Sequence, residues 1–535
     1  MNTTQHELTE STGAKLVPFI LFERETSSRT AVVCAQSGVS LSYAELARMS
    51  KTLAADLRRN GLRPRERVAI LLPTSVEFAA ALFGAWATDA VVVPLDIFMK
   101  RAELLAILAA IQPRFLITNP NLHRKIHAEL RQTAVCILEY GPSLTTSFVA
   151  PAAASASGLR VTDNTTPLQP TLHSRTAPDE DAVMILSSGT TGLPKAVRLS
   201  HQAVLRNISM HLESLGIEED IRGLQVLPMN YSYGLIASFL SILHTGGTAV
   251  LQPALEARAV LDAVRDHDVN VVMGTPAIFQ HLVESVTDRS ALHPSPVRYV
   301  TIGGDRCKRY ALDLIRKQLP KTKTYITYGL SEAGPRVSTL PPEQVEARPQ
   351  SVGLPLRGVE VRILDDRGKK CHPQEKGEII VKTPSLMNGY FGDPERTQRT
   401  IRDGFCHTGD SGYLDDAGFL YYLGRKDRQF KLGGHLVNPA FVEHCISSHP
   451  LVREAVVEKI ENERDESLCA KITTVPAPQQ ELVTELKRLC RQQMPEHMIP
   501  REFRFENSDR HYYKGKPFNA AKSPVPDEPV CETRG

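Results

Sequence analysis

Four short stretches of the sequence combine glycines, hydroxyl groups and charged side chains in patterns that could bind a nucleotide. The first, Ile185-Leu-Ser-Ser-Gly-Thr-Thr-Gly-Leu-Pro-Lys195, overlaps and follows a predicted strand over 182–186. Glycines let the backbone curl so that N–H groups converge on an anion, and hydroxyls and a lysine complete the cradle. The spacing differs from that of the G-x-x-x-x-G-K-[ST] phosphate loop. The residues alone therefore allow either a phosphate-binding loop or a flexible Ser/Gly loop.

The other stretches offer groups for a base, a metal ion and a ribose. Tyr328-Gly-Leu-Ser-Glu332 follows a predicted strand over 324–327, and ligands bind at such strand ends in α/β sheets. Its ring can stack on a purine and its carboxylate can hold Mg²⁺. His407-Thr-Gly-Asp410 is expected to place an Asp on a Gly turn, where it could accept two hydrogen bonds from a ribose, and Arg425 lies in a basic run over 424–431. Each of these stretches taken alone could also be a surface turn or a solvated basic run. Gly515-Lys516 alone does not indicate any function.

In this order, the four stretches together resemble the adenylate-forming superfamily: acyl- and aryl-CoA synthetases, adenylation domains of peptide synthetases, and luciferases. The resemblance extends from about Phe19 to Lys516. It implies a ligase that uses ATP and Mg²⁺ to convert an aryl, cyclic or acyl carboxylic acid into an acyl-adenylate, with release of pyrophosphate. Transfer to a thiol, most often that of coenzyme A, would follow.

The resemblance also implies roles for the matching residues. Those implied to bind ATP or AMP are Ser187, Ser188, Gly189, Thr190, Thr191, Gly192, Lys195, Gly303, Gly304, Asp305, Tyr328, Gly329, Ser331, Asp410 and Arg425. Those implied to act in catalysis are Thr190, Glu332 (also the Mg²⁺ ligand), Lys431 and Lys516. Asp427 falls at the hinge position. Lys514 competes with Lys516 because the usual Pro-x-Thr is missing before Gly-Lys, and Phe441 stands where the family usually has Glu.

The substrate acid and the acceptor are less defined. The implied acid pocket includes Tyr231, Ser232, Gly303 and Arg336. Activators of α-amino acids carry an Asp in the stretch that here reads Tyr231-Ser232, and a buried ammonium without a partner is costly. An aryl, cyclic or acyl acid is therefore expected, and Arg336 either faces a polar substrate group or lies on the surface.

Three acceptors stay open: coenzyme A, an amine, or a carrier protein acting in trans. The stretches 230–234 and 331–336 resemble stand-alone acid–amine ligases of natural-product biosynthesis, including coronafacate-type ligases. A binding-only relative is disfavoured, because Lys195, Glu332, Asp410 and a C-terminal lysine are all present.

The elements that must position these residues follow from hydrophobic periodicity. Strands and helices alternate in the first half, which is typical of parallel sheets covered on both faces. The expected fold is α/β: an N-terminal domain over 1–426 with two doubly wound sheets (about 19–200 and 201–350) and a small β subdomain (351–426). A mobile α+β domain over 427–535 follows. A linker is expected over 142–178, a strand over 225–228, and a buried helix plus strand within the uncharged segment 223–255.

Composition sets the remaining bounds. The 535 residues carry a net charge of +3, which gives no bias toward nucleic acid or anionic membranes. Hydrophobic residues make up 42% and charged residues 23%, as in an ordinary globular protein. None of the nine cysteines are at C-x-x-C spacing, and no secretory signal or transmembrane segment is recognised. A cytoplasmic enzyme with reduced thiols is expected.

Overall fold

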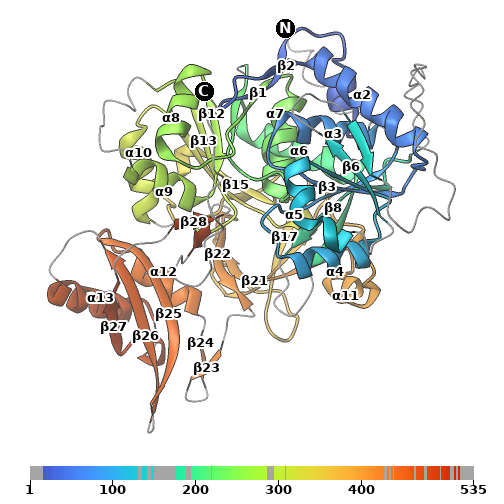
Figure 1. The fold of residues 1–535 in the computed structure, drawn as a ribbon. Helices are drawn as coiled ribbons and strands as arrows, with labels where there is room; N and C mark the ends of the chain where they lie inside the picture. Colours follow the sequence, from blue (N-terminus) through green and yellow to red (C-terminus); the bar gives the residue numbers. More distant parts are fainter. Residues whose placement is uncertain are drawn as a thin grey trace, which may run out of the picture.

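The structure is a computed structural model, and it has the predicted α/β architecture (Figure 1). It describes residues 16–130, 135–140, 146–149, 176–187, 194–217, 220–285, 295–307, 309–426, 430–432, 435–437, 439–462, 465–474, 479–494, 496–506, 511–513 and 516–518. Two large sheets and a small antiparallel sheet are followed by an α+β unit.

The larger sheet has nine strands in the order β16-β15-β14-β13-β12-β10-β11-β1-β2, and those from β14 to β1 run parallel. The bounds are β1 Thr30–Cys34, β2 Ser40–Ser42, β10 Arg222–Gln225, β11 Thr248–Leu251, β12 Val271–Gly274, β13 Tyr299–Ile302, β14 Lys323–Tyr328, β15 Ser338–Leu340 and β16 Leu354–Pro355. Two predictions about this sheet are wrong. β1 and β2 join this sheet although they precede residue 200, because β1 pairs with β11. The strand expected at 225–228 lies at 222–225. Val226 and Leu227 are apolar because they are buried just after the strand ends, so their residue types led to the wrong bounds.

The second sheet has eight strands in the order β19-β9-β8-β4-β3-β5-β6-β7. The bounds are β3 Arg67–Leu71, β4 Val91–Pro94, β5 Phe115–Thr118, β6 Cys136–Tyr140, β7 Thr146–Val149, β8 Asp181–Ser187, β9 Lys195–Ser200 and β19 Gly389–Tyr390. The predicted linker over 142–178 is wrong at residues 146–149, which form β7 and pair with β6 as an antiparallel edge strand. Residues 142–145 and 150–175 of that range lie outside the described part of the chain. The β subdomain also contributes to this sheet, since β19 pairs with β9.

Helices cover the two sheets, and their ends follow the sequence. The predicted capping box at Ser42 and Glu45 begins α2, and the side chains of Ser75 and Ser200 cap α3 and α6. The helices are α1 Phe19–Phe22, α2 Tyr43–Arg59, α3 Val76–Trp86, α4 Arg101–Ile111, α5 Pro120–Leu130, α6 His201–Leu215, α7 Ser241–His244, α8 Ala257–Asp266, α9 Pro276–Ser285, α10 Arg309–Gln318 and α11 Pro394–Thr400, with the π-helix η2 Tyr233–Leu240 and the 3₁₀ turns η4 Ser331–Ala333 and η5 Pro342–Gln344.

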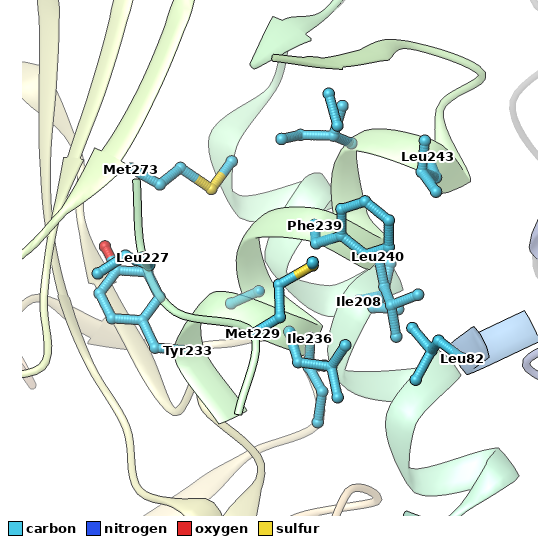
Figure 2. Close-up of a cluster of buried hydrophobic side chains, with 14 of the residues drawn as sticks. Leu82, Ile208, Leu227, Met229, Tyr233, Ile236, Phe239, Leu240, Leu243 and Met273 are labelled. Carbon is cyan, nitrogen blue, oxygen red and sulfur yellow. The ribbon is translucent and has the colours of Figure 1, made fainter. Parts of the chain in front are cut away.

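One hydrophobic core joins the two large sheets. Figure 2 shows Leu82 of α3 facing Ile208 of α6 and Leu240 of η2. The uncharged segment therefore forms a buried helix plus the strand β11, as predicted, with the helix in π geometry. Within the described part of the chain, no helix is long and apolar enough to cross a membrane.

The small sheet and the C-terminal unit complete the fold. The antiparallel sheet contains β17 Glu360–Leu364, β18 Gly377–Lys382, β20 Ile401–Arg402, β21 Phe405–Leu414 and β22 Leu420–Arg425. The C-terminal unit has its own core between α12 Pro439–Ser447, α13 Gln479–Gln493 and the sheet of β25 Val452–Asn462, β26 Asp465–Thr474 and β27 Glu502–Phe505. It also contains η7 Glu496–Met498 and the hairpins β23 Phe430–Leu432/β24 His435–Val437 and β28 His511–Tyr513/β29 Lys516–Phe518.

Candidate active site

A cavity of about 410 Å³ gathers charged side chains from distant parts of the sequence. Lys195 at the start of β9, Glu332 in η4 and Arg425 at the end of β22 all line it. These three residues come from three different predicted motifs, and the fold brings them to one place. The other charged or aromatic residues of the lining are Asp365, Asp366, Glu378, Tyr390, Arg399, Arg402, His407 and Lys426.

Asp410 lies beside this cavity and is only 4% exposed. Tyr328 Oη donates to its Oδ2 at 2.5 Å, and Arg425 Nη1 donates to its Oδ1 at 3.2 Å. Burial raises the pKa of Asp410 to about 6, against the lowering effects of Arg425 and Tyr328. The site thus holds a buried carboxylate between one cation and one phenol.

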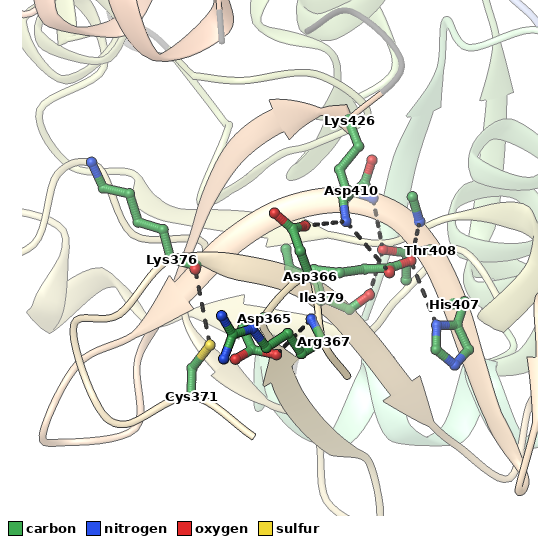
Figure 3. Close-up of polar contacts among 12 residues, drawn as sticks. Asp365, Asp366, Arg367, Cys371, Lys376, Ile379, His407, Thr408, Asp410 and Lys426 are labelled. Atoms are coloured by element: carbon green, nitrogen blue, oxygen red, sulfur yellow. Dashed lines mark hydrogen bonds and ion pairs between the residues drawn. The ribbon is translucent and has the colours of Figure 1, made fainter. Parts of the chain in front are cut away.

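The predicted turn around Asp410 is wrong. Residues 407–410 lie within the ten-residue strand β21, where Asp410 is opposite Arg425 of β22. Gly409 has a φ of +70°, which permits a local kink at this point without ending the strand. The Asp410 backbone N–H donates to Thr408 Oγ1 at 3.0 Å, and Figure 3 shows Thr408 and Asp410 close to Lys426.

Tyr390 was missed by sequence reasoning, yet it connects two predicted site residues. Its hydroxyl donates to Glu332 Oε1 at 2.8 Å, and Lys195 Nζ lies 5.7 Å from its ring centroid. Tyr390 reaches this position because β19 pairs with β9, with Tyr390 opposite Val197. No motif marks this pairing in the sequence, and the same holds for Arg399 and Arg402.

The residues predicted to bind the base include Tyr328, one of a pair of neighbouring tyrosines. The rings of Tyr328 and Tyr422 have centroids 5.6 Å apart. Gly303, Gly304 and Asp305 directly follow β13, the neighbour of β14, which ends at Tyr328. Tyr422 was not predicted, since a tyrosine in a strand carries no specific signal.

The predicted acid pocket is assembled from η2, η4 and the loops beside them. Ser232 and Ser331 share a hydrogen bond of 2.8 Å, and Tyr231 Oη donates to Asp96 at 3.4 Å. The region therefore contains a carboxylate that the sequence analysis did not place there. The loop after Gly329 folds back so closely that a Cβ there would lie 2.1 Å from the Pro335 carbonyl oxygen. This turn brings the next residue, Arg336, into the interior, where it is only 1% exposed and not on the surface.

Several predicted residues lie outside the described part of the chain. They are Ser188, Gly189, Thr190, Thr191, Gly192, Asp427 and Lys514. For Lys431 and Lys516 the structure describes the backbone, in β23 and β29, but not the side chain. The hairpin that contains Lys516 lies next to α9. Ser187, the first residue of the phosphate motif, ends β8.

The residues present fit a magnesium ion bound with a polyphosphate. Mg²⁺ is usually held by one or two carboxylates together with substrate phosphates. Glu332 supplies one carboxylate in the cavity next to Lys195. Among the described residues there is no group of three or more His, Cys, Asp or Glu side chains that could hold a metal ion by themselves.

Comparisons with known proteins give matches along most of the chain. The family model for AMP-binding enzymes matches residues 22–391, and the model for the AMP-binding enzyme C-terminal domain matches 442–511. The chain is 31% identical to a feruloyl-CoA synthase of Amycolatopsis sp, over 90% of this chain and 93% of that protein. It is 30% identical to 4-coumarate–CoA ligase 4 of Arabidopsis thaliana, over 82% and 78%.

Two solved structures are also similar. The o-succinylbenzoate CoA synthetase MenE of Bacillus subtilis, in complex with its acyl-adenylate OSB-AMP, has a TM-score of 0.76 and 26% identity, covering 96% of this chain and 99% of that one. The amide bond synthetase McbA of Marinactinospora thermotolerans has a TM-score of 0.79 and 26% identity, covering 92% and 96%.

Proposed function

The chain belongs to the AMP-binding enzyme family, and we propose that it activates a carboxylic acid with ATP and then transfers the acyl group to the thiol of coenzyme A. In the first half-reaction a carboxylate oxygen attacks the α-phosphorus of ATP. The bond from that phosphorus to the pyrophosphate oxygen breaks, and acyl-adenylate and pyrophosphate form. In the second, the sulfur attacks the acyl carbon, AMP leaves, and the thiol proton is released.

One observation carries this proposal: Lys195, Glu332 and Arg425 line a single cavity beside the buried carboxylate of Asp410. Negative charge builds up on the oxygens of the α-phosphate and of the departing pyrophosphate, so cations are needed next to them. Lys195 supplies a cation, and Glu332 would hold Mg²⁺, which would neutralise phosphate charge when bound. Asp410 would accept hydrogen bonds from the ribose hydroxyls.

The groups around these residues restrict their motion. Tyr390 fixes Glu332 through its hydroxyl and presents its ring to Lys195. Arg425 fixes Asp410 from the opposite strand. Such positioning before the reaction, together with electrostatic stabilisation, is what a protein contributes to phosphoryl-type transfer.

The two half-reactions need different groups near the acid. In this proposal Lys516 neutralises charge during adenylation, and Lys431, on the hairpin β23/β24, acts in the transfer step. The chain would divide at residues 426–427, with Asp427 as the hinge. Motion of a small domain about such a hinge is a common way to separate two steps.

A second acceptor, an amine, is supported by the likeness to the amide bond synthetase McbA. In that case the amine nitrogen attacks the acyl carbon, AMP leaves, the nitrogen releases a proton, and the product is an amide. A carrier protein acting in trans is the third possibility. All three acceptors share the adenylation step.

The experiment is to measure pyrophosphate release from ATP and Mg²⁺ over a panel of carboxylic acids, each with coenzyme A, with an amine, or with neither. Acid-dependent release that speeds up with coenzyme A and yields an acyl-CoA supports the proposal. Faster release and amide formation only with amines would transfer the proposal to the second acceptor. No release with any acid would overturn it. Lys195→Ala serves as the inactive reference for background ATP hydrolysis.

A further inference from the structure

Arg336 is a buried cation whose charge is not neutralised by any described residue. It is 1% exposed, and its guanidinium carbon lies 3.9 Å from the ring centroid of Tyr233. Nη1 donates to the Pro335 carbonyl at 2.8 Å. In the described part of the chain, Nε and Nη2 have no hydrogen-bond partner and no carboxylate lies within ion-pair distance. Burying a charge without a partner is costly, so such a group calls for an explanation.

The polar neighbours of Arg336 do not supply an anion. Burial and the nearby Arg336 hold the pKa of His211 well below its usual value, so this imidazole is neutral at neutral pH. Asn207 donates to the Arg336 carbonyl at 2.9 Å, while its own Oδ1 has no partner in the described structure. Burial also lowers the pKa of Arg336, but a guanidinium remains protonated near neutral pH.

Two half-buried arginines of the described chain are neutralised by carboxylates. Arg198 pairs with Asp181 at 2.8 Å, and Arg425 pairs with Asp410 at 3.2 Å. Others, such as Arg306, have no carboxylate within ion-pair distance among the described residues but donate to a backbone carbonyl, here that of Ala440 at 2.9 Å. Arg336 combines full burial with two unpaired nitrogens in the described structure, an arrangement that a partner from outside the chain would complete.

The position of Arg336 connects it to the predicted acid pocket. Tyr233, the ring it covers, donates to the carbonyls of Gly274 and Thr301 at 3.1 and 3.2 Å. The same ring lies against Gly303 and Gly304, where an added Cβ would come within 3.4 and 3.2 Å of it. The residue before it, Ser232, bonds to Ser331. Arg336 thus packs on Tyr233, whose ring borders Gly303 and Gly304 of the predicted acid pocket.

We propose that Arg336 binds a second carboxylate of the substrate, so that the acid activated by this protein is a dicarboxylic acid. This inference rests on the proposed function, since it names the acid for the same site. One carboxylate would react at the α-phosphorus, and the other would receive two N–H donors from Nε and Nη2. A planar guanidinium matches a carboxylate in this two-point arrangement.

The test compares linear and aromatic dicarboxylic acids of increasing length with their monomethyl esters, measured by pyrophosphate release. Arg336→Met keeps an unbranched apolar stem but removes the guanidinium and its charge. Arg336→Lys keeps a charge without the two-point geometry. Arg348→Met is the matched control, because Arg348 also stacks on a ring (Phe419, 4.2 Å) but lies outside the proposed pocket.

We expect the unmodified protein to prefer one dicarboxylic acid over its monoester by on the order of 10² in kcat/KM, as for a lost charged hydrogen bond. Arg336→Met removes this preference, Arg336→Lys retains part of it, and Arg348→Met retains it fully. The melting temperature of Arg336→Met without substrate stays level or rises, because an unpaired buried charge is removed. A structural arginine would give the opposite: a lower melting temperature and an equal loss for all acids, which would overturn the inference.

A failure of the proposed function can be distinguished from a failure of this inference. If no acid supports pyrophosphate release, calorimetry of the dicarboxylic acids with the unmodified protein and Arg336→Met still decides the inference. Binding that requires Arg336 supports it, and no binding overturns it. A preference for monocarboxylic or neutral hydroxy acids in the release assay overturns it as well.

Discussion

The phenol of Tyr328 and the carboxylate of Asp410 join two different sheets through one hydrogen bond of 2.5 Å. Tyr328 ends β14 of the nine-stranded sheet, and Asp410 lies in β21 of the small antiparallel sheet. Both side chains are buried, and burial raises the pKa of each. In the proposed function, nucleotide binding would therefore depend on a titratable group at the junction of two sheets.

The first prediction concerns pH. Since the pKa of Asp410 in the folded protein is about 6 rather than 3.8, its carboxyl takes up a proton as the pH falls through about 6. A protonated carboxyl accepts fewer hydrogen bonds from a ribose. We expect adenosine affinity to fall about tenfold from pH 7 to pH 5, measured by calorimetry. Adenosine is the suitable probe because it has no phosphate that titrates in this range.

The same shift has a consequence for stability with a definite sign. Between about pH 6 and 3.8 the folded protein binds a proton that the unfolded chain does not. This group therefore favours the folded state more as the pH falls through that window.

The control for the pH dependence of adenosine binding is Asp410→Asn, which should bind adenosine weakly at every pH. A pH-dependent affinity that persists in this variant would contradict the assignment.

The second prediction concerns Arg425, the cation that opposes the rise in the pKa of Asp410. Arg425 is the largest influence that lowers the pKa of Asp410. We expect Arg425→Met to move the midpoint of adenosine binding above pH 6, in addition to weakening it. Lys426→Met is the matched control, because Lys426 lines the same cavity but pairs with Asp366 at 3.4 Å and Glu378 at 3.8 Å (Figure 3). An unchanged midpoint in Arg425→Met would contradict the prediction.

The third prediction tests Tyr390 as a positioning residue. Tyr390→Phe removes the hydrogen bond to Glu332 but keeps the ring near Lys195. Loss of such a partner of a metal-binding carboxylate typically weakens metal affinity at least tenfold. We expect the Mg²⁺ concentration for half-maximal pyrophosphate release to rise about tenfold. Tyr390→Leu should in addition raise the KM for ATP, and a Mg²⁺ dependence unchanged in both variants would exclude the role.

Much of the fold could be predicted because periodicity and capping are local. The alternation of strands and helices, the capping box at Ser42 and the buried helix in 223–255 all depend on neighbouring residues. Strand partners depend on distant ones. Nothing near Thr30 indicates that β1 joins β11, more than two hundred residues later, and nothing near Gly389 indicates pairing with β9.

The residues of the candidate site also fall into those that local sequence predicts and those that depend on distant strand pairing. Lys195, Glu332, Asp410 and Arg425 lie in motifs with unusual local composition, and the sequence marked all four. Tyr390 and Tyr422 reach the site through strand pairing, so their types alone gave no signal. Arg336 was recognised as a candidate, but whether it lay inside or outside depended on the turn at 329–335, where Gly329 closely approaches Pro335.

The fourth prediction concerns the contact between the large part of the chain and α12. Arg306 Nη1 donates to the Ala440 carbonyl at 2.9 Å, and Lys376 Nζ lies 3.7 Å from the ring of Phe441. The ring of Phe441 thus receives a cation. We expect Arg306→Met to speed hydrogen exchange in α12 roughly tenfold, as for one lost charged hydrogen bond.

Its control is Arg309→Met, since Arg309 pairs with Asp313 on its own helix at 2.7 Å. Exchange in α12 that is equal in the two variants would mean that Arg306 does not hold this contact.

The last prediction decides between the two C-terminal lysines. Lys516 lies in β29, and its hairpin is next to α9, which follows directly on the loop after β12. A cation that stabilises charge only in the transition state contributes on the order of 10²–10³ to the rate. Lys516→Ala should therefore slow acid-dependent pyrophosphate release by that factor while adenosine affinity stays level. Lys514→Ala, two residues away on the same chain segment, should leave the rate close to that of the unmodified protein. The reverse result would assign the role to Lys514, and a full rate in both variants would mean that adenylation here needs no C-terminal lysine.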